Sequence, residues 1–161
     1  MLMWLKEETK VWFEVTNLLI PSLNDDPREI RQLSEWILEH LGPDVPLHFT
    51  AFHPDFKLQD KPKTPPETLH SAHKIAVDAG LHYVYEGNIH GGAAHTFCPA
   101  CGKILIRRSW HDVLENLLRD GACPSCGQMI PGRWTNARVS NNPAILQASD
   151  KAASKYGALN L

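Results

Sequence analysis

Two copies of one short cysteine unit constrain this chain more than any other feature. The first unit, CPACG, contains Cys98 and Cys101, and the second, CPSCG, contains Cys123 and Cys126. Each pair can present two thiolates to a shared ion, and four thiolates make the tetrahedral site typical of structural zinc, with bonds of about 2.3 Å. The glycine after each pair permits the positive φ at which backbone amides turn toward sulfur. The doubled unit therefore predicts one metal centre, Zn²⁺, in a ribbon-type module over residues 97–134.

Two other uses of the four cysteines stay open from the spacing. A single iron or an iron–sulfur cluster also takes four cysteine ligands, and two redox-active CxxC pairs are the other alternative. Redox pairs would be expected within a thioredoxin-like unit, which the sequence does not show. The chain starts without the pattern of a signal peptide, which predicts a cytoplasmic location and reduced thiols. Since a structural zinc site is closed at four ligands, we expect three nearby histidines to be exposed linker residues rather than ligands: His90, His95 and His111.

The first half of the chain alternates strand and helix patterns. Apolar, β-branched runs predict three strands, over residues 11–20, 46–52 and 81–85. Two helices are predicted between the strands, over residues 26–42 and 64–80. Asp26 and Thr64 are their expected N-caps, each followed by proline and then glutamate, and apolar stripes lead to a glycine at each end. Residues 1–10 match the end of a further helix. This β-α-β-α-β order predicts an α/β fold of right-handed parallel units, in a sheet or a barrel.

The domain boundary is predicted in the glycine-rich segment 89–96, which would link the α/β part, residues 1–88, to the ribbon. Residues 104–118 inside the ribbon fit either a β-hairpin or a short helix. Residues 135–161 are expected to form a tail that is weakly helical or disordered. A net charge of −2 provides no basic field for nucleic acid, and the apolar runs are too short to cross a membrane.

Two polar residues lie where α/β proteins bind ligands. His53 follows the second predicted strand, and ligand sites form at the carboxyl ends of parallel strands. Asn17 interrupts the first strand, which is otherwise apolar. From position alone, a backbone-capping role explains either residue as well as a ligand contact does. His70 and His73 share a predicted helix face without an obvious carboxylate partner, so we expect them at the surface.

Six segments, in this order and spacing, resemble the C-terminal half of the AmmeMemoRadiSam radical-SAM enzymes, which are similar to pyruvate formate-lyase-activating enzymes. They fall between about residues 4 and 134: VTNLLIP (15–21), LNDDP (23–27), LHFTAFHPDF (47–56), TPPETL (64–69), YVYEGN (83–88) and the CPxCG units. The resemblance implies the C-terminal part of a partial (β/α)6 TIM-type barrel, followed by a small zinc ribbon. Ser22 stands where that family usually has glycine.

The resemblance also implies cofactors that this chain does not hold by itself. Members of that family bind a 4Fe–4S cluster through CxxxCxxC and cleave S-adenosylmethionine reductively to a radical. This chain contains no CxxxCxxC, while His53 and Asn17 match positions that face the cofactor. We therefore expect a truncated or split radical-SAM enzyme, inactive alone, whose open sheet edge is covered by a separate N-terminal half or by a second copy. The alternative is a non-catalytic zinc-ribbon module that acts with another protein.

Overall fold

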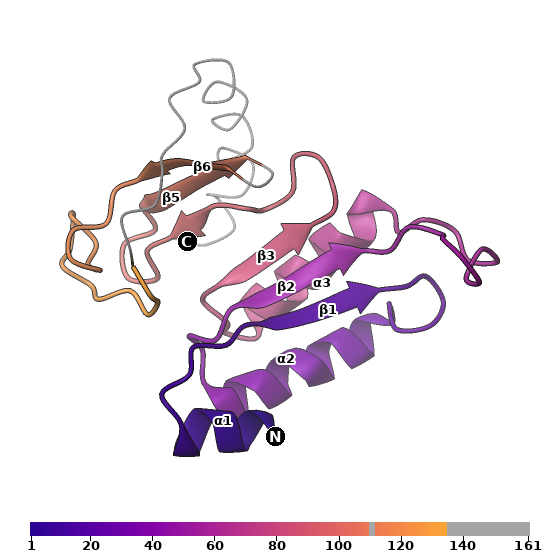
Figure 1. Cartoon of the computed structure of the whole chain (residues 1–161), viewed down its shortest axis with the longest axis horizontal. Coiled ribbons are helices and arrows are strands. Elements are labelled where there is room, and N and C mark those ends of the chain that lie inside the picture. Colours follow the sequence, from indigo (N-terminus) through magenta and orange to yellow (C-terminus); the bar gives the residue numbers. More distant parts are fainter. Residues whose placement is uncertain (110–111, 135–161) are drawn as a thin grey trace. The chain divides into compact units, whose positions relative to one another are not determined.

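The computed structural model describes residues 1–109 and 112–134 of the 161-residue chain. The chain divides into two compact units, the first over Met1–Gly92 and the second beginning at Ala93. Each unit contains its own three-stranded sheet (Figure 1). The division falls inside the segment 89–96 that the glycine content marks as a linker.

The sheet of the first unit is parallel. Its strands pair in chain order: β1 (Val15–Leu19), β2 (Leu47–Ala51) and β3 (Val84–Gly87). Helix α2 (Pro27–Leu41) connects β1 to β2, helix α3 (Pro66–Asp78) connects β2 to β3, and α1 (Leu2–Glu8) precedes them. The predicted β-α-β-α-β order is present, and the unit is α/β with a parallel sheet. All three strands are shorter than the apolar runs that predicted them, and β3 starts three residues later than expected.

Helix α2 starts and ends at residues that the sequence marks clearly. Asp26 is its N-cap, and the Asp26 side chain accepts a hydrogen bond from the backbone N–H of Arg28 at 2.8 Å. At the other end Gly42 has φ of +86°, and its N–H donates to the carbonyl of Ile37 at 3.0 Å. Both contacts satisfy backbone groups that a helix end leaves open.

Helix α3 begins differently from the expected capping pattern. Its N-cap is Pro65, which provides no side-chain hydrogen bond. Thr64 is instead fully buried: its hydroxyl donates to the carbonyl of Leu19 at 2.6 Å and accepts from the N–H of Phe52 at 2.9 Å. Thr64 therefore ties together the carboxyl ends of β1 and β2, which is where α/β proteins position their ligand-binding loops.

Both long helices cover the same face of the sheet. α2 and α3 pack on each other and on one set of strand side chains, which together form a single core. Phe49 at the centre of β2 is fully buried in this core, with Ile37 of α2 and Leu69 of α3 also inaccessible to solvent. Figure 1 shows the two helices on one side of the strands. The sheet is thus wound in one direction only, and its second face receives no helix from the described part of this unit.

The second face presents polar and aromatic side chains in register. Thr16, His48 and Tyr85 form one row across the three strands. The rings of His48 and Tyr85 stack with centroids 5.1 Å apart, and His48 Nε2 lies 2.6 Å from a carboxylate oxygen of Glu14. Leu18, one row further along β1, is 42% exposed. Parallel sheets usually bury both faces, so this face is unusual for a finished α/β domain.

The turn after β1 contains a serine in a glycine-like conformation. Ser22 has φ of +65°, in the left-handed region that favours glycine. Its N–H donates to Asp25 Oδ1 at 2.8 Å, and its hydroxyl accepts from Lys61 at 3.2 Å. These contacts hold the turn in spite of the backbone cost.

The second unit is built on an antiparallel sheet. Its strands are β4 (Thr96–Phe97), β5 (Ile104–Ser109) and β6 (Asp112–Asn116), paired in that order. Of the two forms open for residues 104–118, the structure has the β-hairpin. Among the described residues of this unit, four large aliphatic side chains are buried, namely Leu105, Ile106, Leu114 and Ile130. The predicted tail, residues 135–161, lies outside the described residues.

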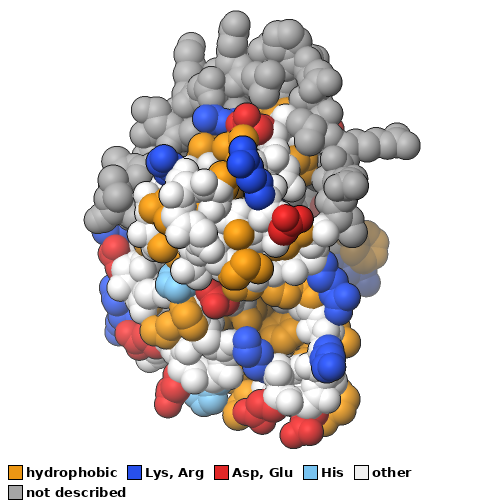
Figure 2. Space-filling model, turned by 90° about the vertical axis from the view of Figure 1, so that its left-hand side faces the viewer, with side chains coloured by type: hydrophobic (Ala, Val, Ile, Leu, Met, Phe, Trp, Pro, Cys, Tyr) orange, Lys and Arg blue, Asp and Glu red, His pale blue; other side chains and the backbone are white. Residues whose placement is uncertain are grey.

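Two further expectations concern membrane crossing and surface charge. Among the described residues, no helix has the length and apolar character that a membrane crossing requires. On the face drawn in Figure 2, lysine and arginine side chains are interspersed with aspartate and glutamate side chains.

Candidate metal centre

The first CPxCG unit forms a tight hydrogen-bonded turn. The N–H of Cys98 donates to the carbonyl of Lys103 at 2.8 Å, and the N–H of Gly102 donates back to the carbonyl of Cys98 at 2.9 Å. Gly102 has φ of +69°, a conformation that costs a residue with a Cβ atom. The glycine expected from the sequence therefore closes the turn.

The second CPxCG unit repeats this turn bond for bond. The N–H of Cys123 donates to the carbonyl of Gln128 at 2.9 Å, and the N–H of Gly127 donates to the carbonyl of Cys123, also at 2.9 Å. Gly127 has φ of +77°. Two equivalent turns that face each other are how a ribbon presents two pairs of sulfurs to one point.

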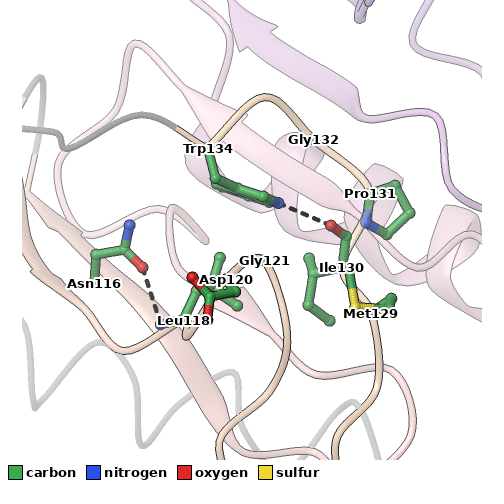
Figure 3. A pocket seen from close by; sticks show the side chains of 9 residues that line it. All are labelled: Asn116, Leu118, Asp120, Gly121, Met129, Ile130, Pro131, Gly132 and Trp134. Carbon is green, nitrogen blue, oxygen red and sulfur yellow. Dashed lines mark hydrogen bonds between the residues drawn. The ribbon is translucent and has the colours of Figure 1, made fainter.

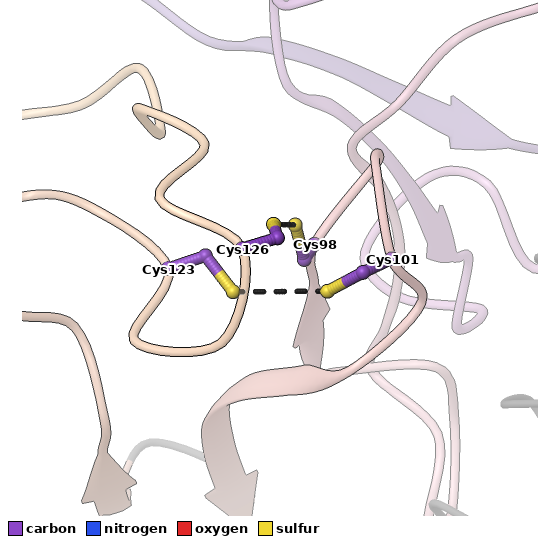
Figure 4. Close-up of side chains that lie close together, drawn as sticks. All are labelled: Cys98, Cys101, Cys123 and Cys126. Atoms are coloured by element: carbon purple, nitrogen blue, oxygen red, sulfur yellow. Dashed lines mark hydrogen bonds between the residues drawn. The ribbon is translucent and has the colours of Figure 1, made fainter.

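The four sulfurs of these turns meet in one cluster (Figure 4). All four Sγ atoms lie within 4.8 Å of one another. The Sγ atoms of Cys98 and Cys126 are 3.6 Å apart, and those of Cys101 and Cys123 are 3.8 Å apart. A tetrahedron with metal–sulfur bonds of about 2.3 Å has sulfurs about 3.8 Å apart, while a disulfide needs about 2.05 Å. The four cysteines are free thiols and can bind one metal ion.

The cysteines differ in burial and in proton affinity. Cys98 and Cys123 are each 2% exposed, whereas Cys126 is at the surface. Burial raises the pKa of the Cys98 thiol to about 12, against the effect of backbone N–H groups of Cys101 and Ala100. Burial also opposes ionisation of Cys123, but the N–H groups of Ser125 and Cys126 and the neighbouring thiols lower its pKa to about 6. Since the thiolate is the form that binds metal, metal binding at this cluster would release protons.

The histidines near the centre do not share one environment. His95 is buried, and its Nδ1 accepts a hydrogen bond from the N–H of Arg108 at 3.1 Å. The expectation of an exposed linker histidine is wrong for His95, because β5 packs against it. His90 is exposed, as expected. His111 lies outside the described residues.

His53 and Asn17, the predicted cofactor-binding residues, make separate local contacts. His53 follows β2, is exposed, and its Nδ1 lies 3.0 Å from the carbonyl oxygen of Pro54. Asn17 lies in register with Phe49 and Glu86, whose side chains are on the helix-covered face. Its amide oxygen accepts from Asn24 Nδ2 at 3.3 Å. These contacts are the backbone- and loop-supporting roles weighed from the sequence, and the cofactor role of both residues stays a prediction.

A second polar cluster went unseen in the sequence. The carboxylate of Glu86 on β3 is completely buried, and its Oε2 lies 2.8 Å from Nδ1 of His70 on α3. His73, one turn further along α3, is 4% exposed, and burial lowers its pKa against the attraction of Glu86. The expectation of two surface histidines without a carboxylate partner is therefore wrong. Their spacing of three showed a shared helix face, but Glu86 is 16 residues from His70 and reaches it only through the fold.

An open pocket of about 540 Å³ lies in the second unit (Figure 3). Trp134 forms one wall, and its indole N–H donates to the carbonyl of Ile130 at 2.8 Å. The indole lies over two glycines: a Cβ added to Gly132 would come within 2.4 Å of the ring, and one added to Gly121 within 2.9 Å. Met129 on the pocket rim is 62% exposed. The pocket therefore presents an aromatic and a thioether surface to solvent.

Comparison with known proteins places the chain beside a longer archaeal protein. Uncharacterized protein MJ0808 of Methanocaldococcus jannaschii is 41% identical over 129 residues, which is 78% of this chain and 39% of that protein. This chain thus spans about two fifths of the length of the relative it matches. No family model matches the chain. No solved structure matches it either.

Proposed function

We propose that the chain holds one structural zinc ion and forms part of a larger radical-SAM enzyme of the activating-enzyme type. Zinc fits the chemistry of the donor set best, because four thiolates in a closed tetrahedron are its preferred structural site. A 4Fe–4S cubane does not fit there, since four sulfurs within 4.8 Å of one another leave room for a single ion. The cluster and most contacts to S-adenosylmethionine would then come from another polypeptide segment.

The observation that carries this proposal is the one-directional winding of the first unit. Two successive right-handed crossovers place α2 and α3 on one face of the parallel sheet and leave the other face open. A parallel sheet wound this way buries its second face by curving into a β/α barrel or by receiving another protein part. The six sequence segments that resemble the radical-SAM family support the barrel, and the archaeal relative is long enough to contain an additional part.

In such a barrel, the residues of this chain would position the cofactor and enclose the interior, and they would not themselves react. Thr64 fixes the carboxyl ends of β1 and β2, where His53 and the turn at Ser22 emerge. His53 would contact the cofactor at that edge, and the polar row of Thr16, His48 and Tyr85 would line the interior. When bound, S-adenosylmethionine and the cluster supply the radical chemistry.

Reconstitution tests the enzyme proposal directly. The chain would be incubated anaerobically with iron, sulfide and S-adenosylmethionine, alone and together with an N-terminal radical-SAM half that contains CxxxCxxC. We expect cluster absorbance and cleavage of S-adenosylmethionine only in the combined sample, with zinc retained in both. Cluster assembly and cleavage that are unchanged by His53→Ala would argue against the role of His53. A combined sample without cleavage would contradict the enzyme proposal.

The alternative is a non-catalytic zinc-ribbon module that acts with another protein. The pocket at Trp134 favours it, because an exposed Met129 beside an indole is a surface suited to an apolar side chain of a partner. A partner that binds the ribbon would lose affinity on Trp134→Ala, while cleavage of S-adenosylmethionine would never appear. The two proposals therefore predict opposite results in the same reconstitution.

A further inference from the structure

One side of the pocket in the second unit is a two-residue turn. Arg119 and Ala122 exchange backbone hydrogen bonds of 3.0 and 2.9 Å across Asp120 and Gly121. These two central residues have φ of +51° and +78°, and positive φ at both positions is what a type I′ turn requires, for which Asp–Gly is a preferred sequence. The turn therefore explains a short polar residue at position 120, but it does not use the negative charge.

The carboxylate of Asp120 lines the pocket without a cationic partner. Among the described residues that form the lining, Asp120 has the one charged side chain. The hydrogen bonds and ion pairs of the described residues do not involve its carboxylate. Arg119 and Arg133 are close to lining residues in the sequence, but both lie outside the lining. An occupant of the pocket would therefore meet an uncompensated negative charge.

Trp134 and Met129 supply the apolar part of the same pocket (Figure 3). The indole is fixed by its hydrogen bond to the carbonyl of Ile130 and by its close approach to Gly121 and Gly132. Even so, Trp134 is 38% exposed and Met129 is 62% exposed. An indole attracts a cation that lies over its ring, and a thioether packs well against aliphatic groups. The pocket thus combines a carboxylate, an aromatic ring and a flexible apolar side chain.

The lining discriminates between kinds of occupant. A purely apolar side chain would pack on Met129, but it would displace water from the Asp120 carboxylate without replacing the hydrogen bonds, which costs free energy. An anionic group would be repelled. Lysine and arginine side chains have an aliphatic stem and a cationic head, so they match the apolar and the charged parts together. The pocket volume of about 540 Å³ lies within the roughly 300–1,000 Å³ of pockets that bind ligands.

We infer that this pocket binds a lysine or arginine side chain of a partner protein. The aliphatic stem would pack on Met129, and the cationic head would lie between the Asp120 carboxylate and the Trp134 indole. The inference rests on the alternative function, in which the ribbon acts with another protein, and it specifies the chemistry of that partner. The bound side chain is then amphipathic rather than purely apolar. Neither radical chemistry nor the first unit is required.

Peptide titration followed by nuclear magnetic resonance provides the test. The zinc-loaded full chain would be titrated with capped alanine pentapeptides whose central residue is lysine, arginine or norleucine. Binding is read from the indole N–H signal of Trp134, which Trp134→Phe identifies among the five tryptophans. We expect a cationic peptide to bind at least about threefold more tightly than the norleucine peptide, and less tightly as salt is added.

Each result of this titration bears on the inference. Binding of one cationic peptide but not the other would support it and identify the side chain that the partner presents. Equal affinity for the norleucine peptide would overturn it, because the carboxylate would then contribute nothing. A Trp134 signal that no peptide shifts would also overturn it.

Asp120→Asn separates the charge from the turn. Asparagine also suits a type I′ turn, so the variant should fold and keep its zinc, which metal analysis would verify. Binding of the cationic peptide should weaken about two- to fivefold, as for an exposed ion pair, and binding of the norleucine peptide should not change. Asp112→Asn removes the same charge from an exposed residue of β6 outside the lining and should bind as the parent chain does. Equal losses in both variants would refute the site, because net charge would then explain the binding.

The reconstitution described above separates this inference from the proposed functions. Binding that depends on Asp120, without cleavage of S-adenosylmethionine in the combined sample, would support both the pocket and the alternative function. The same binding together with cleavage would support the pocket and contradict the alternative. Cleavage without peptide binding would support the enzyme and overturn the pocket.

Discussion

Removal of the metal is expected to unfold the second unit and to leave the first unit folded. Four buried aliphatic side chains form the described core of the second unit, and at about 1.5–3 kcal/mol each they contribute about 6–12 kcal/mol together. Zinc bound to a four-ligand structural site contributes about 10–16 kcal/mol at neutral pH. A bound zinc ion would thus be the largest single stabilising term in this unit. The first unit has its own core of 14 buried residues and no residue of the centre.

Hydrogen exchange with mass spectrometry measures both units in one sample. A chelator would remove the metal, and elemental analysis would verify its loss. Peptides from Ile104–Ser109 and Asp112–Asn116 should then exchange at rates typical of an unfolded chain, and zinc should restore their protection. Peptides from Leu47–Ala51 should exchange as before. Persistent protection of the β5–β6 hairpin in metal-free protein would refute the reasoning, because the apolar core would then suffice.

A pair of variants within one turn controls for the chelator. Cys126→Ser removes one sulfur of the cluster and should weaken metal binding and destabilise the hairpin, as chelation does. Ser125→Ala changes the adjacent exposed residue, whose side chain is not a ligand, and should leave metal content at one ion per chain. If both variants kept the ion equally well, Cys126 would not be a ligand.

Three further predictions concern the first unit and use urea unfolding as the assay. His73 is buried and its pKa is lowered, so as pH falls the unfolded chain binds a proton at His73 before the folded chain does. The free energy of unfolding should therefore fall as pH drops below about 6.5, by at most about 1.4 kcal/mol per pH unit. His73→Gln should reduce this slope; an unchanged slope would exclude His73 as its source. Thr64→Val should cost about 2–4 kcal/mol, because the buried N–H of Phe52 and carbonyl of Leu19 each lose a partner; a loss below about 0.5 kcal/mol would contradict that role. Ser22→Gly should raise stability by about 0.5–1 kcal/mol through release of the left-handed strain, and a decrease would show that the Ser22 hydroxyl contact outweighs it.

Features set by neighbouring residues were predictable from the sequence. The CPxCG turns close through bonds between residues four or five apart, so their composition alone specifies them. Helix α2 is bounded by Asp26 and Gly42, and each acts on backbone groups of the helix end beside it. The β5–β6 hairpin was ambiguous because Val113 and Leu114 satisfy a short helix as well as a strand. Pairing of β6 with β5 settled the choice, and pairing is not local.

Features set by packing between distant segments were not predictable. Glu86 reads as one polar residue at the end of a short apolar run, and only the register of β3 beside β2 turns it toward α3. Once there, its buried carboxylate needs a hydrogen-bonding partner, which His70 provides. Thr64 was expected to cap α3, but the position of Leu19 beside it makes the β1–β2 link the better use of its hydroxyl. Asn17 matched both a ligand contact and a loop support, and the fold supplies Asn24 as its partner.

The four-cysteine cluster and the parallel sheet differ in whether the described chain supplies all the groups that they need. A four-thiol cluster can be complete by itself, because every ligand comes from two turns 21 residues apart. A one-directional parallel sheet of three strands is not complete in this sense, because its second face and its β1 edge expose groups that such sheets normally bury. A metal ion bound to this cluster would therefore stabilise the described residues of the second unit, whereas Leu18 and Trp4 of the first unit are exposed in the described structure. Under the proposed function, a further β/α unit over the open face would form an enzyme interior over His48 and Tyr85, whereas a second copy of the chain there would bury the same residues in a dimer.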